Sequence, residues 1–130
     1  MASILIVEDD AMTREILRLA LEDVGHTPSE ASSAAAGSAL LRVAPVPMIV
    51  LLDQLMPGLS GEGLLEQVAS GGEELRRHAY VLLTAGAHRL SPRMVELLEE
   101  LNVPLVAKPF DFDTILAAVD AAALHLGQLS

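Results

Sequence analysis

The chain has 130 residues, of which 52% are hydrophobic, and it carries a formal net charge of −10 at pH 7. This length suits one compact domain with a substantial core, and the acidic charge argues against nucleic acid as a direct partner. The sequence has no cysteine, so we exclude disulfide scaffolds and thiolate zinc sites. It has no apolar stretch of roughly 20 residues, and its first residues do not show a basic region followed by a cleavable apolar core, so we expect no membrane span and a cytoplasmic protein.

Short apolar runs alternate with longer amphipathic stretches along the chain. In chain order they predict a strand at 3–7, a helix at 11–24, a strand at 26–31, a helix at 33–42, a strand at 48–53, a helix at 61–69, a strand at 79–84, a helix at 92–101, a strand at 103–107 and a helix at 111–126. The segment 26–31 is the weakest strand, and the glycine pair at 71–72 begins a loop. Because a helix separates each strand from the next, we expect one α/β domain over residues 1–130, with a parallel sheet, helices on both faces and no second domain.

Several helix ends carry residues that favour capping. Ser91 followed by Pro92 predicts the start of the fourth helix, and Asp111 predicts the start of the fifth. Gly25 predicts the end of the first helix. For Asp10 we prefer a role as the cap of the first helix over a role in chemistry.

Polar groups stand at the carboxyl ends of four of the five predicted strands. In chain order they are Glu8, Asp9 and Asp10 directly after the first strand, Asp53 as the last residue of the third, Thr84 as the last residue of the fourth and Lys108 directly after the fifth. Ligands of open parallel sheets bind beyond the carboxyl ends of the strands, so we expect these groups to share one edge of the sheet. This edge is the candidate functional site.

Three of these residues, Glu8, Asp9 and Asp53, would form an acidic cluster. Two carboxylates about 4 Å apart repel each other by roughly 4 kcal/mol at an effective dielectric of about 20, so the cluster either has shifted pKa values or holds a cation. Oxygen ligands without a nearby histidine or cysteine favour Mg²⁺, with Mn²⁺ as a substitute. The alternative, that these acids only cap the next helix, explains one acid better than it explains three.

Lys108 is the only lysine in the chain, and it stands between the apolar run 103–107 and Pro109. Its ammonium is a compact charge that can extend over the sheet edge to Asp53 or to an anion bound there. Pro109 ends the strand and restricts the residue before it, which would fix the direction of the lysine. A lysine that only protects an edge strand from aggregation is the weaker alternative, because we expect this strand to be apolar and flanked by helices.

Four segments carry these groups, in order along the chain. They are the opening strand with its acids in ILIVEDDAMTRE, the aspartate in VLLDQLMPGLSGEGLL, the threonine in VLLTAG and the lysine in VAKPF. Together they resemble the receiver domain of two-component response regulators, and the resemblance covers the whole chain. It implies a flavodoxin-like (βα)5 fold, a doubly wound parallel sheet with the strand order 2-1-3-4-5.

The resemblance also implies a role for each group at the sheet edge. Asp53 would accept a phosphoryl group from a phosphohistidine and become an aspartyl phosphate. Lys108, with a cis peptide bond to Pro109, would pair with the phosphoryl group, and Thr84 would move toward it. The ligands of Mg²⁺ would be Asp9, Asp53, the backbone carbonyl of Leu55 and Glu8, the last either directly or through a water.

A protein of this kind would be a switch that catalyses only its own phosphorylation and dephosphorylation, and so not an enzyme with a separate substrate. The resemblance implies a sensor histidine kinase or a histidine phosphotransfer protein as one partner and a downstream protein target as the other. It implies neither nucleic acid nor membrane as a partner. The apolar positions of the helix at 92–101 leave open whether the protein is a monomer or a homodimer.

One position departs from the family. An aromatic residue usually stands three positions before the lysine and turns inward together with the threonine, but here the position is occupied by Leu105. A second hypothesis is therefore a degenerate receiver that acts as a phosphorylation-independent interaction or dimerisation module. The intact acid pair, together with Asp53, Thr84 and Lys108, favours the phosphoryl acceptor.

Two other kinds of strand-end site do not fit the sequence. Phosphatases of the haloacid dehalogenase type need a second acid two residues after the nucleophile, where this chain has Leu55. A flavodoxin-like FMN site needs a loop rich in Ser, Thr and Gly after the first strand, whereas this chain has the acidic segment EDDAMTRE there. That segment would repel a phosphate.

Overall fold

The structure, a computed structural model, describes residues 2–54, 58–84 and 90–129. In chain order its elements are β1 (Ser3–Val7), α1 (Ala11–Asp23), β2 (Thr27–Ala31), α2 (Ala34–Val43), β3 (Ile49–Asp53), α3 (Gly61–Ser70), α4 (Glu73–Arg76), β4 (Ala79–Thr84), α5 (Pro92–Glu100), β5 (Leu105–Ala107) and α6 (Phe112–Leu129). Among the described residues, no helix combines the length and the apolar character needed to cross a membrane.

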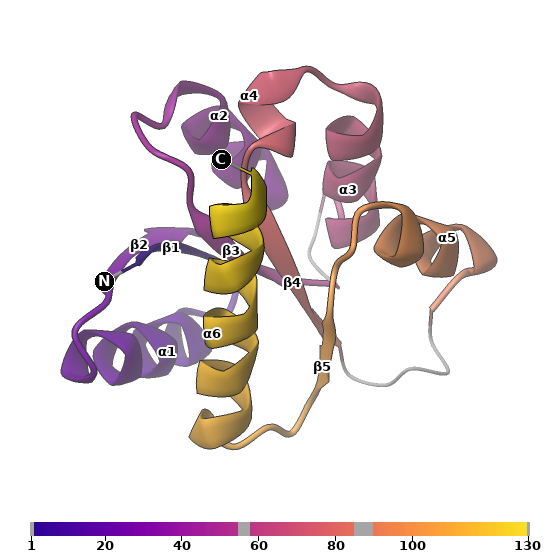
Figure 1. The fold of residues 1–130 in the computed structure, drawn as a ribbon. Coiled ribbons are helices and arrows are strands. Elements are labelled where there is room, and N and C mark those ends of the chain that lie inside the picture. The colour runs from indigo at the N-terminus through magenta and orange to yellow at the C-terminus, as the bar shows by residue number, and fades with distance from the viewer. Residues whose placement is uncertain (1, 55–57, 85–89, 130) are drawn as a thin grey trace.

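The strands form one parallel sheet in the order β2-β1-β3-β4-β5, with helices on both faces (Figure 1). Successive residues of a strand point to opposite faces. In β1, Ile4 and Ile6 therefore pack with α1 and α6, whereas Leu5 and Val7 pack with α2, α3 and α5. The strand order and the apolar layer on each face of the sheet together confirm the predicted flavodoxin-like fold.

The strands at 3–7 and 79–84 have the predicted bounds, and the weakest predicted strand is present as β2. This strand lies at the edge of the sheet, and its one buried residue is Ala31. Edge position therefore explains its weak apolar pattern, because most of its side chains face solvent.

The predicted capping residues begin their helices. The side chains of Asp10, Ser91 and Asp111 each accept a hydrogen bond from the backbone N–H three residues later, at the starts of α1, α5 and α6. Each bond satisfies one of the N–H groups that a helix start leaves without an internal partner. Asp10 therefore acts as a cap, as predicted.

The short helix α4 was not predicted, because the glycines at 71–72 were interpreted as the start of a loop. The helix forms because Leu75 is buried completely in the core, on the face covered by α2 and α3. Glu74 pairs with Arg42 of α2 at 3.0 Å. A four-residue helix has no periodic apolar pattern of its own, so only tertiary packing stabilises it.

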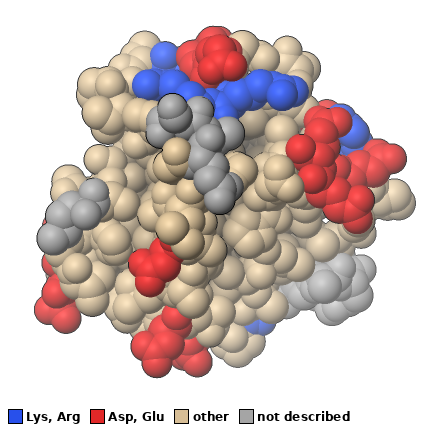
Figure 2. All heavy atoms as spheres, in the orientation of Figure 1, with Lys and Arg blue, Asp and Glu red and all other residues tan. Residues whose placement is uncertain are grey.

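Two arginines join α4 to the neighbouring helices. Arg76 donates to the carbonyl oxygen of Ala69 in the last turn of α3, and Arg77 donates to the carbonyl oxygen of Ala44, which caps α2. Figure 2 shows basic side chains gathered at this end of the molecule, with an acidic group beside them. Cations at helix C-termini are favourable because the last carbonyl groups carry partial negative charge.

The last strand is shorter and more exposed than predicted from the run 103–107. β5 contains three residues, of which Val106 is buried against α6, whereas Leu105 and Ala107 are exposed. Because residues alternate between faces, Leu105 and Ala107 lie on the α5 side, and α5 leaves them uncovered. We expected helices to flank this strand, but the α5 side of Leu105 and Ala107 is exposed. The Lys108–Pro109 peptide bond is cis, as the resemblance implied.

The first residue of α3 provides a test of how tightly the sheet edge is packed. A Cβ atom at Gly61 would lie 2.8 Å from the carbonyl oxygen of Asp53 and 3.0 Å from Cα of Gln54. Backbone atoms cannot yield as a flexible side chain can, so we expect Gly61→Ala to lower the free energy of unfolding by about 1–3 kcal/mol. Urea denaturation measures this change.

Gly127 of α6 is the matched control, because a Cβ atom there would meet nothing within 4 Å. We expect Gly127→Ala to leave the free energy of unfolding unchanged or to raise it by less than about 1 kcal/mol. Equal effects of the two substitutions would contradict the close packing of Gly61 against β3.

Candidate functional site

The carboxyl ends of three neighbouring strands place the predicted groups at one edge of the sheet. Asp53 is the last residue of β3 and Thr84 is the last residue of β4, and both are buried. Glu8 follows β1 directly, with its backbone N–H donating to the carbonyl oxygen of Ala31 at 3.1 Å. This bond continues the pairing of β1 with β2 by one residue and holds the Glu8 side chain inside, where 2% of its surface is exposed.

Lys108 connects the ends of β1, β3 and β5. Its ammonium nitrogen lies 3.1 Å from Oε1 of Glu8 and 3.1 Å from Oδ1 of Asp53. The backbone N–H of Lys108 donates to the carbonyl oxygen of Thr84, so the lysine is also bound to the end of β4. The ammonium therefore points over the sheet edge toward the carboxylates, as the sequence predicted.

Three carboxylates at this edge can share a cation. One oxygen from each of Glu8, Asp9 and Asp53 lies within 4.8 Å of the others. Three carboxylate oxygens fit Mg²⁺, which is usually bound through few protein ligands and keeps several waters. The predicted fourth ligand, the carbonyl of Leu55, lies outside the described residues.

The electrostatics of this edge favour an added cation. Burial, and after it the hydrogen bond and negative charge of Asp53, together raise the pKa of the Glu8 carboxyl to about 7, against the opposing effect of Lys108. For Lys108, burial acts to lower the pKa, but the hydrogen bonds and charges of Asp53 and Glu8 outweigh burial and raise it. The ammonium therefore stays charged, and a single positive charge faces more than one carboxylate.

Gln54 is a site residue that the sequence analysis missed. It follows Asp53 directly, is 7% exposed, and its Oε1 accepts a hydrogen bond from the hydroxyl of Thr84, which is completely buried. A polar residue directly after a buried apolar strand was the available signal. The sequence could not identify Thr84 as the partner of Gln54, because the two residues are 30 positions apart in the chain.

Leu105, the predicted second switch position, lies on the same face of the sheet as Thr84. Leu105 pairs with Leu82 in the register of β4 and β5, and Thr84 pairs with Ala107, so all four side chains point to the α5 side. Leu105 is 37% exposed. It stands at the position expected for the aromatic residue, and it leaves part of this face uncovered.

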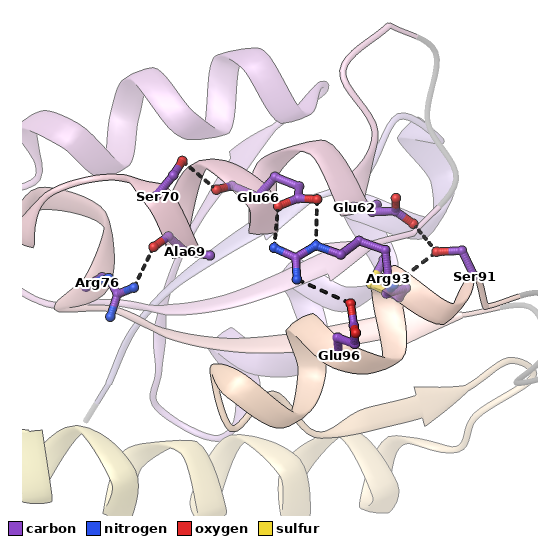
Figure 3. Close-up of polar contacts among 9 residues, drawn as sticks. Glu62, Glu66, Ala69, Ser70, Arg76, Ser91, Arg93 and Glu96 are labelled. Carbon is purple, nitrogen blue, oxygen red and sulfur yellow. Dashed lines mark hydrogen bonds and ion pairs between the residues drawn. The ribbon is translucent and has the colours of Figure 1, made fainter.

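Helix α5, which follows β4 in the chain, is joined to α3 by polar contacts (Figure 3). The guanidinium of Arg93 binds both carboxylate oxygens of Glu66 at 2.8 Å, and the hydroxyl of Ser91 donates to Glu62 at 2.6 Å. Ser91 also caps α5. The start of α5 is therefore held against the first two turns of α3. Met94 and Leu97 of the same helix are buried, so most of its apolar positions pack inward.

A cavity of about 460 Å³ lies at the opposite edge of the sheet, near the starts of β3 and β4. Its lining includes Arg76 and Arg77, whose guanidinium groups already bind carbonyl oxygens of α3 and α2. These arginines have a structural role, and the cavity is remote from the acidic cluster.

Comparisons with known proteins agree with this geometry. The family described as the response regulator receiver domain matches residues 4–120. Among curated proteins, the transcriptional regulatory protein FixJ of Azorhizobium caulinodans is 33% identical over 120 residues, which are 90% of this chain and 53% of FixJ. The chain spans about half the length of the first curated relatives that it matches.

Solved structures give the same fold. A CheY-like response regulator receiver domain protein of Methanospirillum hungatei has a TM-score of 0.77 at 27% identity, covering 98% of this chain and 95% of that chain. A response regulator receiver domain protein of Clostridium thermocellum has a TM-score of 0.86 at 21% identity and covers all of both chains. The second likeness bears on the fold alone.

The raised pKa of Glu8 predicts how stability depends on pH. Without a metal, between about pH 4.5 and pH 7 the folded state keeps a proton on Glu8 that the unfolded state has lost, so the free energy of unfolding falls as the pH rises. We expect Glu8→Gln to flatten this dependence and to stabilise the protein by on the order of 1–2 kcal/mol at pH 8 in EDTA. Urea denaturation at pH 5 and pH 8 measures both effects.

The exposed acid Glu99 on α5 provides the control, because Glu99→Gln removes a carboxylate that is not part of the cluster. We also expect Mg²⁺ to stabilise the wild type more at pH 8 than at pH 5, since the ion and the proton compete for Glu8. Parallel pH profiles of wild type and Glu8→Gln would contradict the proposed burial of this charge.

Proposed function

The chain belongs to the response regulator receiver domain family, and from this membership we propose that it is a phosphoryl-accepting switch of a two-component system. In this proposal Asp53 is the phosphoacceptor, and a sensor histidine kinase or a histidine phosphotransfer protein is the donor. The protein catalyses only its own phosphorylation and dephosphorylation. It passes the signal on by binding another protein.

One observation carries the proposal: the Lys108 ammonium lies 3.1 Å from a carboxylate oxygen of Asp53, beside two further acids that can share an ion with Asp53. A carboxylate nucleophile needs positive charge around the phosphoryl group that approaches it, because the charge on that group would otherwise repel the acids. Lys108 supplies one such charge. The acid cluster is suited to hold another.

The chemistry of the transfer follows from these positions. A carboxylate oxygen of Asp53 attacks the phosphorus atom, a P–O bond forms as the P–N bond to the donor imidazole breaks, and the electron pair of that bond leaves with the nitrogen. When bound by Glu8, Asp9 and Asp53, Mg²⁺ supplies charge that neutralises the phosphoryl oxygens. Lys108 stabilises the same oxygens from the β5 side.

Phosphorylation adds about −1.5 to −2 charges to an edge that is already acidic. The new oxygens are strong acceptors, and the hydroxyl of Thr84 is a donor at the end of the adjacent strand. Movement of Thr84 toward the phosphoryl group is the step that changes the surface near α5 and β5. This surface is where we propose that a protein target distinguishes the two states.

The proposed partners are proteins. The net charge of −10 disfavours direct binding of this domain to nucleic acid. The relatives FixJ and CseB are transcriptional regulatory proteins, and the segment that matches this chain covers about half of each. We propose a cytoplasmic location and either a monomer or a homodimer.

Leu105 supports the second candidate function, a degenerate receiver that binds its partners without phosphorylation. This leucine is 37% exposed and has no hydroxyl, so the usual coupling of an inward-turning aromatic residue to the threonine has no counterpart here. Calorimetric titration with beryllofluoride and Mg²⁺ separates the two candidates, because beryllofluoride mimics the phosphoryl group on an aspartate. A phosphoryl acceptor gives saturable binding, whereas the interaction module gives none.

Transfer from a small phosphoryl donor tests the proposal directly. We expect radiolabel from acetyl phosphate to enter the wild type with Mg²⁺ but not in excess EDTA, and not to enter Asp53→Asn at all. Lys108→Ala should slow labelling by about 100-fold, since it removes a charge that stabilises the transition state. Asp23→Asn, an exposed acid at the end of α1, is the matched control and should label at the wild-type rate. Equal labelling in EDTA would refute the proposed metal dependence.

A further inference from the structure

Gln54, which follows the proposed phosphoacceptor Asp53, contacts Thr84, which is expected to move toward the phosphoryl group. Gln54 and Thr84 are both buried, and the Thr84 hydroxyl donates to Oε1 of Gln54. The pair joins the ends of β3 and β4, next to Asp53. A buried amide at this position has no part in the transfer chemistry described above.

The backbone of Gln54 is fixed on both sides. Its N–H donates to the carbonyl oxygen of Leu83 at 3.0 Å, and its carbonyl oxygen accepts a hydrogen bond from the N–H of Gly61 at 3.2 Å. One bond joins it to β4 and the other to the first residue of α3. The side chain therefore projects from a rigid position, and its amide stays within reach of Thr84.

A hydroxyl group has a single proton and donates it to one acceptor at a time. If Asp53 accepts a phosphoryl group, as the proposed function holds, the new oxygens compete with Gln54 for the Thr84 proton. A charged acceptor makes a stronger hydrogen bond than a neutral amide oxygen. The phosphoryl group can therefore win this competition, but only after the bond to Gln54 is broken.

We propose that Gln54 is a positioning residue that keeps the Thr84 hydroxyl engaged in the unphosphorylated protein, so that phosphorylation of Asp53 acts by displacing this hydrogen bond. The inference rests on the proposed function and adds the residue that restrains the switch. Leu105 has no aromatic ring that could restrain Thr84, whereas the Gln54 amide binds Thr84 directly.

The first turn of α3 connects this hydrogen bond to α5. Gly61 binds the backbone of Gln54, and the next residue, Glu62, accepts the hydrogen bond from Ser91 at the start of α5 (Figure 3). Gly61 thus binds Gln54, the partner of Thr84, and the adjacent Glu62 binds Ser91 at the start of α5. The partner of Thr84 and the start of α5 are therefore both bound to the first turn of α3.

The affinity for beryllofluoride in the presence of Mg²⁺ tests the competition. Gln54→Leu removes the competing acceptor while keeping a similar volume, so we expect beryllofluoride to bind about fivefold more tightly, which corresponds to about 1 kcal/mol. Thr84→Val should weaken binding, and more so in the Gln54→Leu background than in the wild type. Gln54→Met serves as a second variant if the leucine side chain does not pack at this position.

Gln67 of α3 offers a matched control. Its Oε1 accepts a hydrogen bond of 2.9 Å from the hydroxyl of Ser38, so the pair is again a hydroxyl and an amide oxygen, but it joins α3 to α2 and involves neither Asp53 nor Thr84. Gln67→Leu removes an equivalent bond and should leave the beryllofluoride affinity unchanged. A gain in Gln67→Leu equal to that in Gln54→Leu would indicate a general effect of lost stability, and it would overturn the inference.

A second measurement needs no metal or phosphate analogue. In EDTA, urea denaturation of Gln54→Leu, Thr84→Val and the double variant forms a cycle, and we expect the two positions to be coupled by about fivefold in the unfolding equilibrium constant. Additive effects would show that the hydrogen bond does not restrain Thr84 and would overturn the inference.

The two levels of the proposal fail in different ways. If the wild type does not bind beryllofluoride with Mg²⁺, the proposed function fails and the inference fails with it. If the wild type binds but Gln54→Leu binds equally or more weakly, the role of Gln54 is refuted while the phosphoryl-accepting function stands.

Discussion

The contact of one ammonium group with two carboxylates organises the functional edge of this protein. Lys108 reaches Glu8 and Asp53 at 3.1 Å each, and these residues come from three different strands. Buried carboxylates are costly unless paired, and an unpaired buried lysine is costly as well. The three groups therefore stabilise one another. The parallel sheet brings them together because the carboxyl ends of its strands lie at a common edge. The acidic excess that remains makes this edge suited to hold a cation.

The elements around this edge are fixed by contacts of a different kind. Asp10 caps α1 directly beside the acid pair, and Gly61 allows α3 to approach the backbone of Asp53 and Gln54 without a clash. At the far edge of the sheet, Arg76 and Arg77 of the α4 region bind the carbonyl oxygens of α3 and α2. The far edge is therefore held by hydrogen bonds to helix ends, whereas the near edge carries the acidic cluster and Lys108.

The path from the site to the surface differs from the pattern expected for the family. Thr84 is bound to Gln54, α5 is joined to α3 through Ser91 and Arg93, and Leu105 is partly exposed where an aromatic ring is usual. In this structure hydrogen bonds and an ion pair hold Thr84 and α5, and no aromatic ring packs at position 105. The Leu105 side chain on β5 leaves an apolar group partly exposed to solvent at this surface.

The sequence by itself determined the strand order through its family resemblance, the caps at Asp10, Ser91 and Asp111, and the acids and lysine of the functional edge. These features depend on local patterns, because apolar runs define strands and the residues that follow a parallel strand share its edge. Tertiary structure alone decided the helix α4, the hydrogen bond between Gln54 and Thr84 and the exposure of Leu105. A four-residue helix forms because Leu75 fits the core, a buried amide finds a partner 30 residues away, and an edge strand is exposed where the neighbouring helix does not cover it. None of these is a property of the residues next to them in the chain, so only the packed structure could reveal them.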